Sequence, residues 1–370
     1  MGAYLSTPVT EKEAFDGEIG DVKYGGASMQ GWRRNMEDAH VVFGEEGGDD
    51  MVSVFGVFDG HGGSEVARFC QEHLAKELLT MDGFSGNVEE SLVKVFHRID
   101  DMLRDSTYHA ELEEFKNKPE CDEPETTEEG GTQSSTDAVL KQLNMVRKMM
   151  FANSGGRQGG TANGGNPGNR EGEGGGAFSE TGVHAGSTAI VAVKKGKTLY
   201  IANAGDSRGV LCRGNAAVAL SEDHKPSLER ERARIVAAGG FLSEIAGMCR
   251  VNGNLNLSRA IGDLKYKGNS SFKPKDQIIT AEPDVKVVDL SEEDKFFVLA
   301  CDGVWDVMDN QQVVEFVATR HEQGKKYSEI GAELLNECLA PDPKLTRGVG
   351  CDNMTILIGG LQPPKPPAAT

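Results

Sequence analysis

The sequence predicts an α+β fold built on antiparallel sheets, and two observations lead to this prediction. Short apolar runs between residues 187 and 220 are joined by links of a few residues. Such links are too short for a helical crossover, so the strands should pair antiparallel. Helical patterns stand in separate blocks and do not alternate with the strands, as they would in a doubly wound sheet.

The first block of expected elements runs from residue 24 to about residue 105. Residues 51–58, MVSVFGVF, are typical of a buried strand. Residues 64–79 then place apolar side chains at helical spacing behind the cap candidate Ser64. Residues 89–103 show the same periodicity and predict a second helix.

The second block runs from residue 187 to residue 360. Its first four strands should form an antiparallel meander, with runs at residues 187–193, 198–204, 207–213 and 216–220. Helices are expected over residues 227–240, about 310–323 and 326–338, and further strands over residues 284–290, 296–301 and 354–360. Neither block has a complete set of strands alone, so we expect one catalytic domain over residues 24–360.

Between the blocks, residues 106–180 differ in composition from the rest of the chain. Residues 111–130 hold nine acidic and two basic side chains, a net charge of -7, and residues 155–176 contain eleven glycines. Neither segment can bury enough apolar surface to offset its conformational entropy, so we expect a long mobile insertion. Residues 137–151 fit a short amphipathic helix, either packed on the flank of the domain or docking a partner. The acidic stretch suits basic protein partners.

The bulk composition excludes several classes of protein. A net charge of -19 argues against binding to nucleic acid or to anionic lipid, which both need a basic surface. The seven cysteines are scattered without a C-x-x-C pair, so we expect neither a zinc site nor disulfides, and a reducing compartment fits best. The longest apolar run, Phe296–Cys301, is far too short to span a membrane, and no secretory signal opens the sequence. We therefore expect a cytoplasmic or nuclear protein.

The two ends of the chain, residues 1–23 and 361–370, are expected to lie outside the catalytic domain. The opening MGAYLS matches the N-myristoylation pattern, with Gly2 as the acceptor and Ser6 at the favourable position. A chance match is the alternative. One acyl chain without a nearby polybasic patch gives only weak, reversible binding, so membrane contact is expected only if Gly2 is acylated.

Acidic residues stand at the ends of several apolar runs, where a sandwich or a barrel would gather them at one rim. They are Asp59, Asp206 and Asp302 after a run and Glu37, Asp38 and Asp352 before one. Carboxylates gathered in this way repel one another unless a cation neutralises them, and Mg²⁺ or Mn²⁺ suits such oxygen ligands. A glycine after the aspartate, such as Gly60, lets a backbone carbonyl approach a metal closely. Taken singly, each site has a plainer alternative: a turn, a solvated acidic face, a hairpin corner or a strand cap.

Nine motifs cover nearly all of the chain outside residues 106–180 and the termini. In order they are YGGASMQGWRRNMEDAH, VFGVFDGHGG, GSTAIVAV, YIANAGDSRGVL, LSEDHKP, LNLSRAIGD, ITAEPDV, LACDGVWDVM and GCDNMT. Together they resemble the ordered motif set of the type 2C, metal-dependent serine/threonine protein phosphatases, and the N-terminus and acidic insertion are most similar to the gamma branch. The resemblance implies a central β-sandwich of two antiparallel sheets, flanked by helices on both sides.

The resemblance also implies an activity. Members of the family hydrolyse phosphoserine and phosphothreonine in proteins by attack of a water that bridges two divalent metals, Mg²⁺ or Mn²⁺, without a phosphoenzyme. By motif match, Asp59 would bridge the two metals and Gly60 would supply its carbonyl. Asp302 and Asp352 would complete the shell of one metal.

Four further carboxylates match positions of weaker or indirect contact in the family. Glu37 and Asp38 would act close to the metals, largely through bound waters. Asp206 and Asp306 match the positions associated with a third metal that is held more weakly.

Two residues match positions that handle the substrate. Arg33 matches the phosphate-binding arginine, whose guanidinium fork suits two phosphate oxygens. His61 matches the position proposed to protonate the leaving alkoxide, a role that suits an imidazole near neutral pH. From the residues alone, a purely hydrogen-bonding role for His61 is equally open.

Rival functions have less support. A cysteine phosphatase needs a thiolate and an arginine in a C-x₅-R loop, whereas Cys301 is followed by aspartates, which raise a thiol pKa. No P-loop sequence is present. A pseudophosphatase that binds phosphoproteins without turnover is disfavoured because every metal and phosphate position is filled, and an acidic docking role would be compatible with catalysis. We expect a monomer that acts on phosphoproteins.

Overall fold

The structure is a computed structural model that describes residues 4–45, 51–117, 183–245 and 247–361. The expected acylation site Gly2, the expected helix at 137–151 and most of the predicted insertion lie outside the described residues. The described residues belong to one compact unit, which joins the chain before residue 119 to the chain after residue 175.

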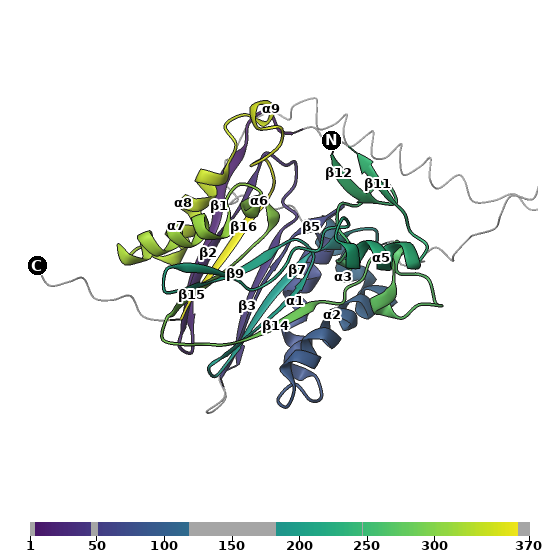
Figure 1. Ribbon diagram of the computed structural model, residues 1–370, viewed down its shortest axis with the longest axis horizontal. Helices are drawn as coiled ribbons and strands as arrows, with labels where there is room; N and C mark the ends of the chain where they lie inside the picture. Colours follow the sequence, from purple (N-terminus) through teal and green to yellow (C-terminus); the bar gives the residue numbers. More distant parts are fainter. Residues whose placement is uncertain (1–3, 46–50, 118–182, 246, 362–370) are drawn as a thin grey trace, which may run out of the picture. The chain divides into compact units, whose positions relative to one another are not determined.

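Two antiparallel sheets form the centre of this unit (Figure 1). The first has six strands in the order β1 (Val9–Ile19), β2 (Val22–Gly31), β16 (Met354–Gly360), β15 (Asp294–Ala300), β9 (Arg208–Arg213) and β10 (Ala216–Ala219). The second has five strands in the order β14 (Asp284–Asp289), β8 (Thr198–Ala204), β7 (Ala189–Lys195), β4 (Val52–Phe58) and β3 (Ala39–Glu45). The prediction of an α+β sandwich is therefore confirmed.

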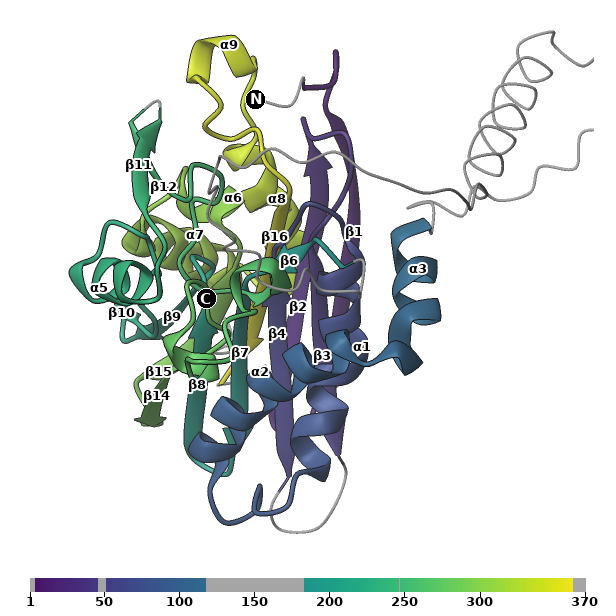
Figure 2. The same cartoon turned by 90° about the vertical axis from the view of Figure 1, so that its right-hand side faces the viewer.

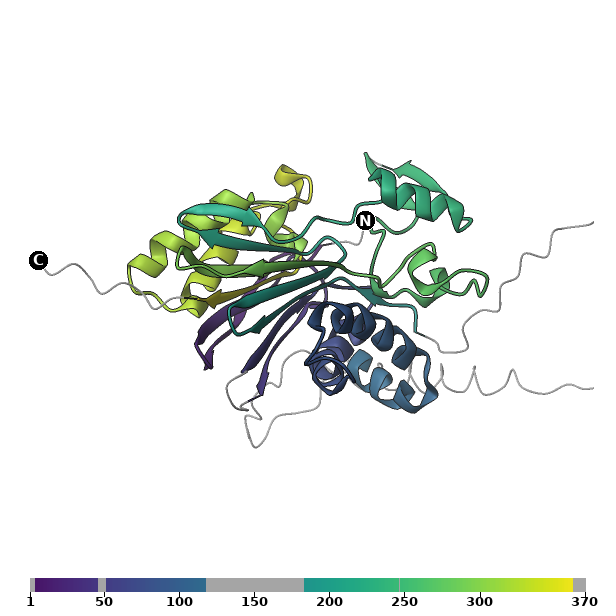
Figure 3. The ribbon, with the colours of Figure 1, turned by 60° about the horizontal axis from the view of Figure 1, so that its bottom comes forward.

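A pair of long helices covers the outer face of each sheet. Helices α1 (Glu65–Thr80) and α2 (Val88–Arg104) lie on the five-stranded sheet, as Figure 2 shows. Helices α7 (Asn310–Glu322) and α8 (Tyr327–Cys338) lie on the six-stranded sheet, on the opposite side of the sandwich (Figure 3). Among the described residues, no helix is both long and apolar enough to cross a membrane.

The central strands are buried on both faces, which explains their continuous apolar sequences. In β4, Phe55 and Val57 belong to the core between the sheets, whereas Val54 and Phe58 belong to the core under α1 and α2. The rings of Phe55 and Phe297 meet across the sandwich with centroids 5.3 Å apart and planes at 68°, an edge-to-face packing. The strands that lead to the acidic residues are thus held rigidly.

Smaller elements complete the unit. Three short strands form one small sheet, β5 (Gly60–His61), β6 (Gly186–Ser187) and β13 (Ile261–Gly262), and two form a hairpin, β11 (Leu242–Ile245) and β12 (Met248–Val251). Among the described residues, the other α-helices are α3 (His109–Asn117), α5 (Glu229–Ala237), α6 (Asp302–Trp305) and α9 (Pro343–Thr346). Single 3₁₀ turns are η1 (Ser106–Tyr108), η2 (Leu264–Tyr266) and η3 (Pro274–Asp276).

The predicted meander over residues 187–220 is wrong in its pairing. Strands β7 and β8 form a hairpin in one sheet, whereas β9 and β10 form a hairpin in the other. The chain changes sheets at Gly205, which has φ +126° and leaves no room for a side chain, since a Cβ would lie 2.5 Å from Thr188. A short link serves a hairpin or a change of sheet equally well, so periodicity could not distinguish the two.

The predicted limits of the folded domain also need correction. The domain does not begin at residue 24, because β1 pairs with β2 along Val9–Ile19. Strand β1 is an edge strand whose side chains are mostly exposed, so its sequence lacks apolar alternation. The mobile insertion does not begin at residue 106, because η1 and α3 are regular structure there. Helix α3 packs on α1 through Leu112, which is buried, and through Glu111, which pairs with His73 at 2.9 Å.

A buried ion pair fastens α2 to the segment that follows β13, and its loss should destabilise the fold. Lys267 Nζ donates to Asp100 Oδ2 at 2.6 Å and to the carbonyl of Ala260 at 2.7 Å, and both charged side chains are almost fully buried. Lys267→Met leaves the carboxylate unpaired, so we expect the free energy of unfolding to fall by about 3–5 kcal/mol in urea titrations.

Lys76→Met is the matched control for this prediction. Lys76 pairs with Glu72 on the surface of α1, where both side chains are about half exposed. Its loss should change the free energy of unfolding by less than about 1 kcal/mol. Equal effects of the two substitutions would contradict the importance of the buried pair.

Candidate metal centre

Strand register brings the acidic residues of both sheets to one end of the sandwich. In the five-stranded sheet, Ala39 pairs with Phe58, so Asp38 and Asp59 become neighbours just beyond the paired residues. In the six-stranded sheet, the N–H of Cys301 donates to the carbonyl of Thr355 at 3.2 Å, which sets Asp302 beside the start of β16. Each sheet therefore contributes one half of the site.

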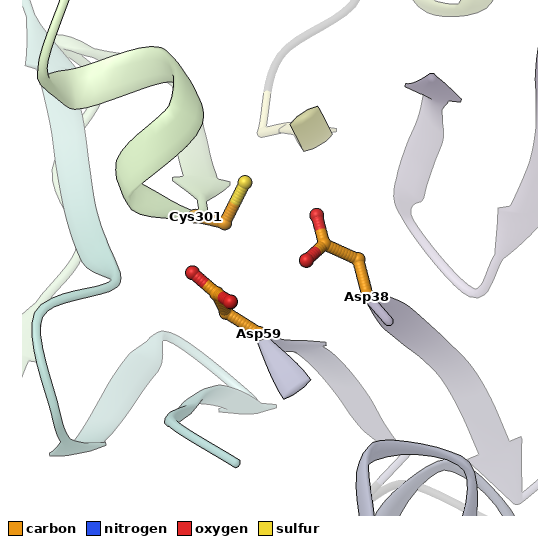
Figure 4. Close-up of side chains that lie close together, drawn as sticks. All are labelled: Asp38, Asp59 and Cys301. Atoms are coloured by element: carbon orange, nitrogen blue, oxygen red, sulfur yellow. The ribbon is translucent and has the colours of Figure 1, made fainter. Parts of the chain in front are cut away.

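Asp38, Asp59 and Cys301 form the innermost part of the site (Figure 4). The nearest oxygen or sulfur atoms of the three side chains lie within 4.8 Å of one another. Both carboxylate oxygens of Asp38 are buried and have no hydrogen-bond partner among the described residues. The Thr355 hydroxyl and the Cys301 thiol are close enough to oppose the rise in the pKa of Asp38, but the hydroxyl donates to Ser28 at 3.1 Å and the thiol donates to the carbonyl of Asn353 at 3.5 Å.

Burial and mutual repulsion perturb the innermost carboxylates. Burial raises the pKa of Asp38 to about 7. Burial, reinforced by the charges of neighbouring aspartates, raises the pKa of Asp59 and the pKa of Asp302 well above their usual range. A partnerless buried carboxylate is costly unless a cation neutralises it, and these oxygens are the donors that hard divalent cations prefer. The residues present thus fit a metal such as Mg²⁺ or Mn²⁺.

Three other carboxylates of the site already have cationic neighbours. Arg33 Nη2 donates to Asp352 Oδ2 at 2.5 Å, and the Lys225 ammonium donates to Asp206. Asp306, at the end of α6, is exposed as a whole residue, but its carboxyl group is partly buried. This partial burial and the charge of Asp206 raise its pKa, and the charge of Lys225 opposes the rise. Among the described residues, Asp352 and Asp206 therefore form ion pairs with basic side chains, whereas Asp38, Asp59 and Asp302 do not.

Glycines after the two strand-end aspartates permit close backbone packing. A Cβ on Gly60 would lie 2.3 Å from the carbonyl oxygen of Glu37, and a Cβ on Gly303 would lie 2.1 Å from that of Asn353. Either contact is impossible for a larger residue, so each Asp-Gly pair is fixed against the segment that supplies the opposite ligands. For Gly60 the structure thus shows a close approach to the backbone of Glu37, and the predicted approach of its carbonyl to a metal stays a prediction.

His61 lies beside the carboxylates and is held by Asp263. His61 Nε2 and Asp263 Oδ2 are 2.7 Å apart, and Asp263 is buried with φ +50°. Burial alone would lower the pKa of His61, but the charge and hydrogen bond of Asp263 outweigh it and raise the pKa. Gly186 leaves room for the pair, since a Cβ there would lie 2.6 Å from both atoms.

The structure gathers all the predicted site residues that it describes. Glu37 is within electrostatic reach of Arg33, His61 and Asp352, and burial raises the pKa of its carboxyl. Asp59 in turn lies within reach of Asp38, Asp206, Asp302 and Asp352. Only Gly2 is not placed, because it lies outside the described residues.

The sequence analysis did not predict three residues of the site, although it recognised the motifs that contain them. Asp263 ends LNLSRAIGD, Lys225 lies in LSEDHKP and Asn353 lies in GCDNMT. Asn353 accepts from the N–H of Glu37 at 2.9 Å and donates to the carbonyls of Gln30 and Asn35, also at 2.9 Å. It therefore holds the loop that carries Arg33. Their polar character within recognised motifs could have marked them as candidates, but only the fold shows which residues they contact.

Comparison with known proteins decides the family. Residues 22–156 and 177–344 match the family "Protein phosphatase 2C". The chain is 41% identical over 367 residues to "Probable protein phosphatase 2C 21" of Arabidopsis thaliana, covering 99% of this chain and 94% of the relative. It is also 40% identical over 359 residues to "Probable protein phosphatase 2C 6" of Paramecium tetraurelia, covering 97% and 99% of the two chains.

The chain belongs to the protein phosphatase 2C family. It is a serine/threonine protein phosphatase, as the motif set predicted. Solved structures of low identity share the fold. A serine-threonine phosphatase 2C from Toxoplasma gondii has a TM-score of 0.57 at 21% identity, covering 97% of this phosphatase and 98% of that chain. The closer likeness to the gamma branch stays a prediction.

The raised pKa of Asp38 makes the metal-free phosphatase less stable at neutral pH. Its pKa rises from 3.8 to about 7 on folding, so between these pH values the folded state holds a proton that the unfolded chain releases. In EDTA, the free energy of unfolding should therefore fall as the pH rises from about 4 to about 7. Asp38→Asn should show a smaller fall, measured by urea unfolding across this pH range.

A surface carboxylate provides the control for the pH experiment. Asp101 is 72% exposed on α2, and Asp101→Asn should keep the wild-type slope. Identical slopes in Asp38→Asn and the wild type would show that Asp38 does not bind the extra proton.

Proposed function

We propose that this phosphatase hydrolyses phosphoserine and phosphothreonine in proteins by a metal-dependent attack of water on phosphorus. The observation that carries the proposal is the pair of buried, partnerless oxygens of Asp38 beside Asp59. An anionic pocket of this kind binds a phosphate only when cations neutralise it first.

The chain offers ligands for two divalent metals, Mg²⁺ or Mn²⁺. Asp59 would bind both metals and the Gly60 carbonyl would contribute a further ligand. Asp302 and Asp352 would complete the shell of one metal, and Glu37 and Asp38 would act largely through bound waters. Cys301 is not proposed as a ligand, because burial and the neighbouring aspartates raise its pKa and keep the thiol neutral. When bound, two such ions would activate a bridging water for attack and offset the charge on the phosphoryl oxygens.

A third metal at Asp206 and Asp306 would be held more weakly. The Lys225 ammonium already donates to Asp206, so a cation there must compete with it. Asp306 is exposed, so its water shell competes as well. The competition from Lys225 and from water both support the prediction that a third metal would bind more weakly than the other two.

Arg33 would bind the phosphate of the substrate. Its side chain is 48% exposed, and the ion pair with Asp352 fixes its direction at the edge of the carboxylate cluster. A guanidinium held in place this way can donate in parallel to two phosphate oxygens.

His61 would give a proton to the leaving alkoxide. Its hydrogen bond to Asp263 fixes the orientation of the ring and favours the protonated form near neutral pH. Proton donation matters for a serine or threonine alkoxide but little for p-nitrophenolate, which is a stable anion.

Other predictions of the sequence remain proposals. They are binding of basic partners by the acidic insertion, N-myristoylation of Gly2 with the membrane contact that it would bring, a cytoplasmic or nuclear location, and a monomeric state without nucleic acid. A pseudophosphatase remains the alternative from another class, and turnover itself decides between the two.

Metal dependence is the direct test of the mechanism. Hydrolysis of p-nitrophenyl phosphate and of a phosphothreonine peptide should require Mn²⁺ or Mg²⁺ and stop in EDTA. Asp302→Asn should reduce kcat by about 100-fold or more, because a charged ligand is lost. Asp101→Asn, which changes an exposed side chain on α2, should keep normal turnover. Turnover in EDTA would refute the mechanism, and binding of the phosphopeptide without turnover would favour the pseudophosphatase.

The role of His61 can be tested by changing the leaving group. His61→Asn should lower kcat on the phosphothreonine peptide by about 100-fold but on p-nitrophenyl phosphate much less. Asp263→Asn should follow the same pattern with a smaller loss, since it acts through His61. Equal losses on the two substrates would show that His61 is not the proton donor.

A further inference from the structure

Exposed large apolar side chains lie at the rim of the phosphate site. Among the described residues, Tyr4, Leu345 and Val349 are 37%, 78% and 47% exposed. We call these three residues the rim patch. Tyr4 comes from the N-terminal part of the chain and lies beside the residue before Arg33, whereas Leu345 and Val349 belong to the segment that runs on to Asp352.

The N-terminal part of the rim patch is anchored beside Arg33. The N–H of Leu5 donates to the carbonyl of Trp32 at 3.0 Å, so Tyr4 runs alongside the residue before Arg33. The Tyr4 hydroxyl also touches Gly348, where a Cβ would lie 2.9 Å from it. Burial raises the pKa of Tyr4, with smaller effects of Cys351, Arg33 and Asp352, which agrees with this position.

The C-terminal part of the rim patch is held on a firm base. Trp32 Nε1 donates to the carbonyl of Ala340 at 2.9 Å, and the N–H of Ala340 donates to the carbonyl of Gly350 at 2.8 Å. Helix α9 is capped by Asp342, whose carboxylate accepts from the N–H of Lys344 at 2.8 Å. The loop is therefore ordered while its apolar side chains face solvent, and Figure 2 shows α9 beyond α6 at the same end of the sheets.

Ordered apolar side chains that stay exposed next to a binding site indicate a contact surface. A phosphoprotein whose phosphate lies on Arg33 must continue across the neighbouring surface. Val349 is only three residues before Asp352, and Tyr4 lies beside the residue before Arg33. The rim patch is thus continuous with the phosphate site.

We propose that the rim patch of Tyr4, Leu345 and Val349 binds an apolar side chain next to the phosphorylated residue of a protein substrate. The proposal rests on the proposed function and names its preferred substrate class: phosphoserine or phosphothreonine segments with an apolar neighbour. The gain comes from removing apolar surface of both partners from water.

The test compares two phosphothreonine peptides of equal length and charge, one with leucines and one with serines flanking the phosphothreonine. With Mn²⁺ present, the wild type should show a kcat/KM about tenfold higher for the leucine peptide. Val349→Ser should reduce this ratio severalfold, mainly through KM. Because each variant is compared with itself, changes common to both peptides cancel.

The hairpin β11–β12 provides a matched control. Ile245 is 47% exposed, the same fraction as Val349, but no described contact links it to Arg33. Ile245→Ser should keep the wild-type ratio. Leu345→Ser serves as a second rim variant, because a side chain 78% exposed contributes little to folding.

Each outcome decides the proposal. A ratio that falls in Val349→Ser and Leu345→Ser but not in Ile245→Ser supports it. No preference in the wild type, unchanged ratios in the rim variants, or a fall only in Ile245→Ser overturns it while leaving the phosphatase activity intact. No turnover of either peptide or of p-nitrophenyl phosphate would overturn the proposed function, and the rim-patch proposal with it.

Discussion

Repulsion between buried carboxylates is the constraint on which the rest of this structure depends. Asp38, Asp59 and Asp302 lie close together in a poorly hydrated place, where burial raises the pKa of each. Such a cluster would disperse on a flexible support. The two sheets prevent this, because each aspartate follows or precedes a strand that is packed on both faces. The packed strands thus hold the carboxylates together despite their mutual repulsion, in a place where bound cations would neutralise them.

The two halves of the site share one local feature, an Asp-Gly pair at the end of a strand. In each sheet, an aspartate at the end of a central strand is followed by a glycine that packs against the backbone leading into a neighbouring strand. Gly60 packs on Glu37, and Gly303 packs on Asn353. These contacts set the positions of the proposed ligands relative to one another through backbone packing.

Different residues around the carboxylates have different proposed roles. Arg33 pairs with Asp352, Lys225 pairs with Asp206, and Asp263 holds His61. The N-terminal residues and the loop around Val349 frame Arg33 with apolar surface. The proposed binding of phosphate, transfer of a proton and contact with the rest of the substrate would therefore fall to separate groups of residues around one charged centre.

The local patterns of the sequence determined the antiparallel α+β class, the buried strands and the acidic strand ends, because apolar runs and Asp-Gly pairs can be recognised without knowing which segments pair. The β-sandwich itself was implied by the resemblance of the motif set to the type 2C phosphatases. The sequence did not determine the edge strand β1, the change of sheet at Gly205 or the extent of α3, because each depends on which surface the segment meets. The partners of Asp263 and Asn353 were equally hidden, since their contacts join segments up to 323 residues apart in the chain. Only the tertiary structure could decide them, because long-range register, and not local composition, sets which polar groups meet.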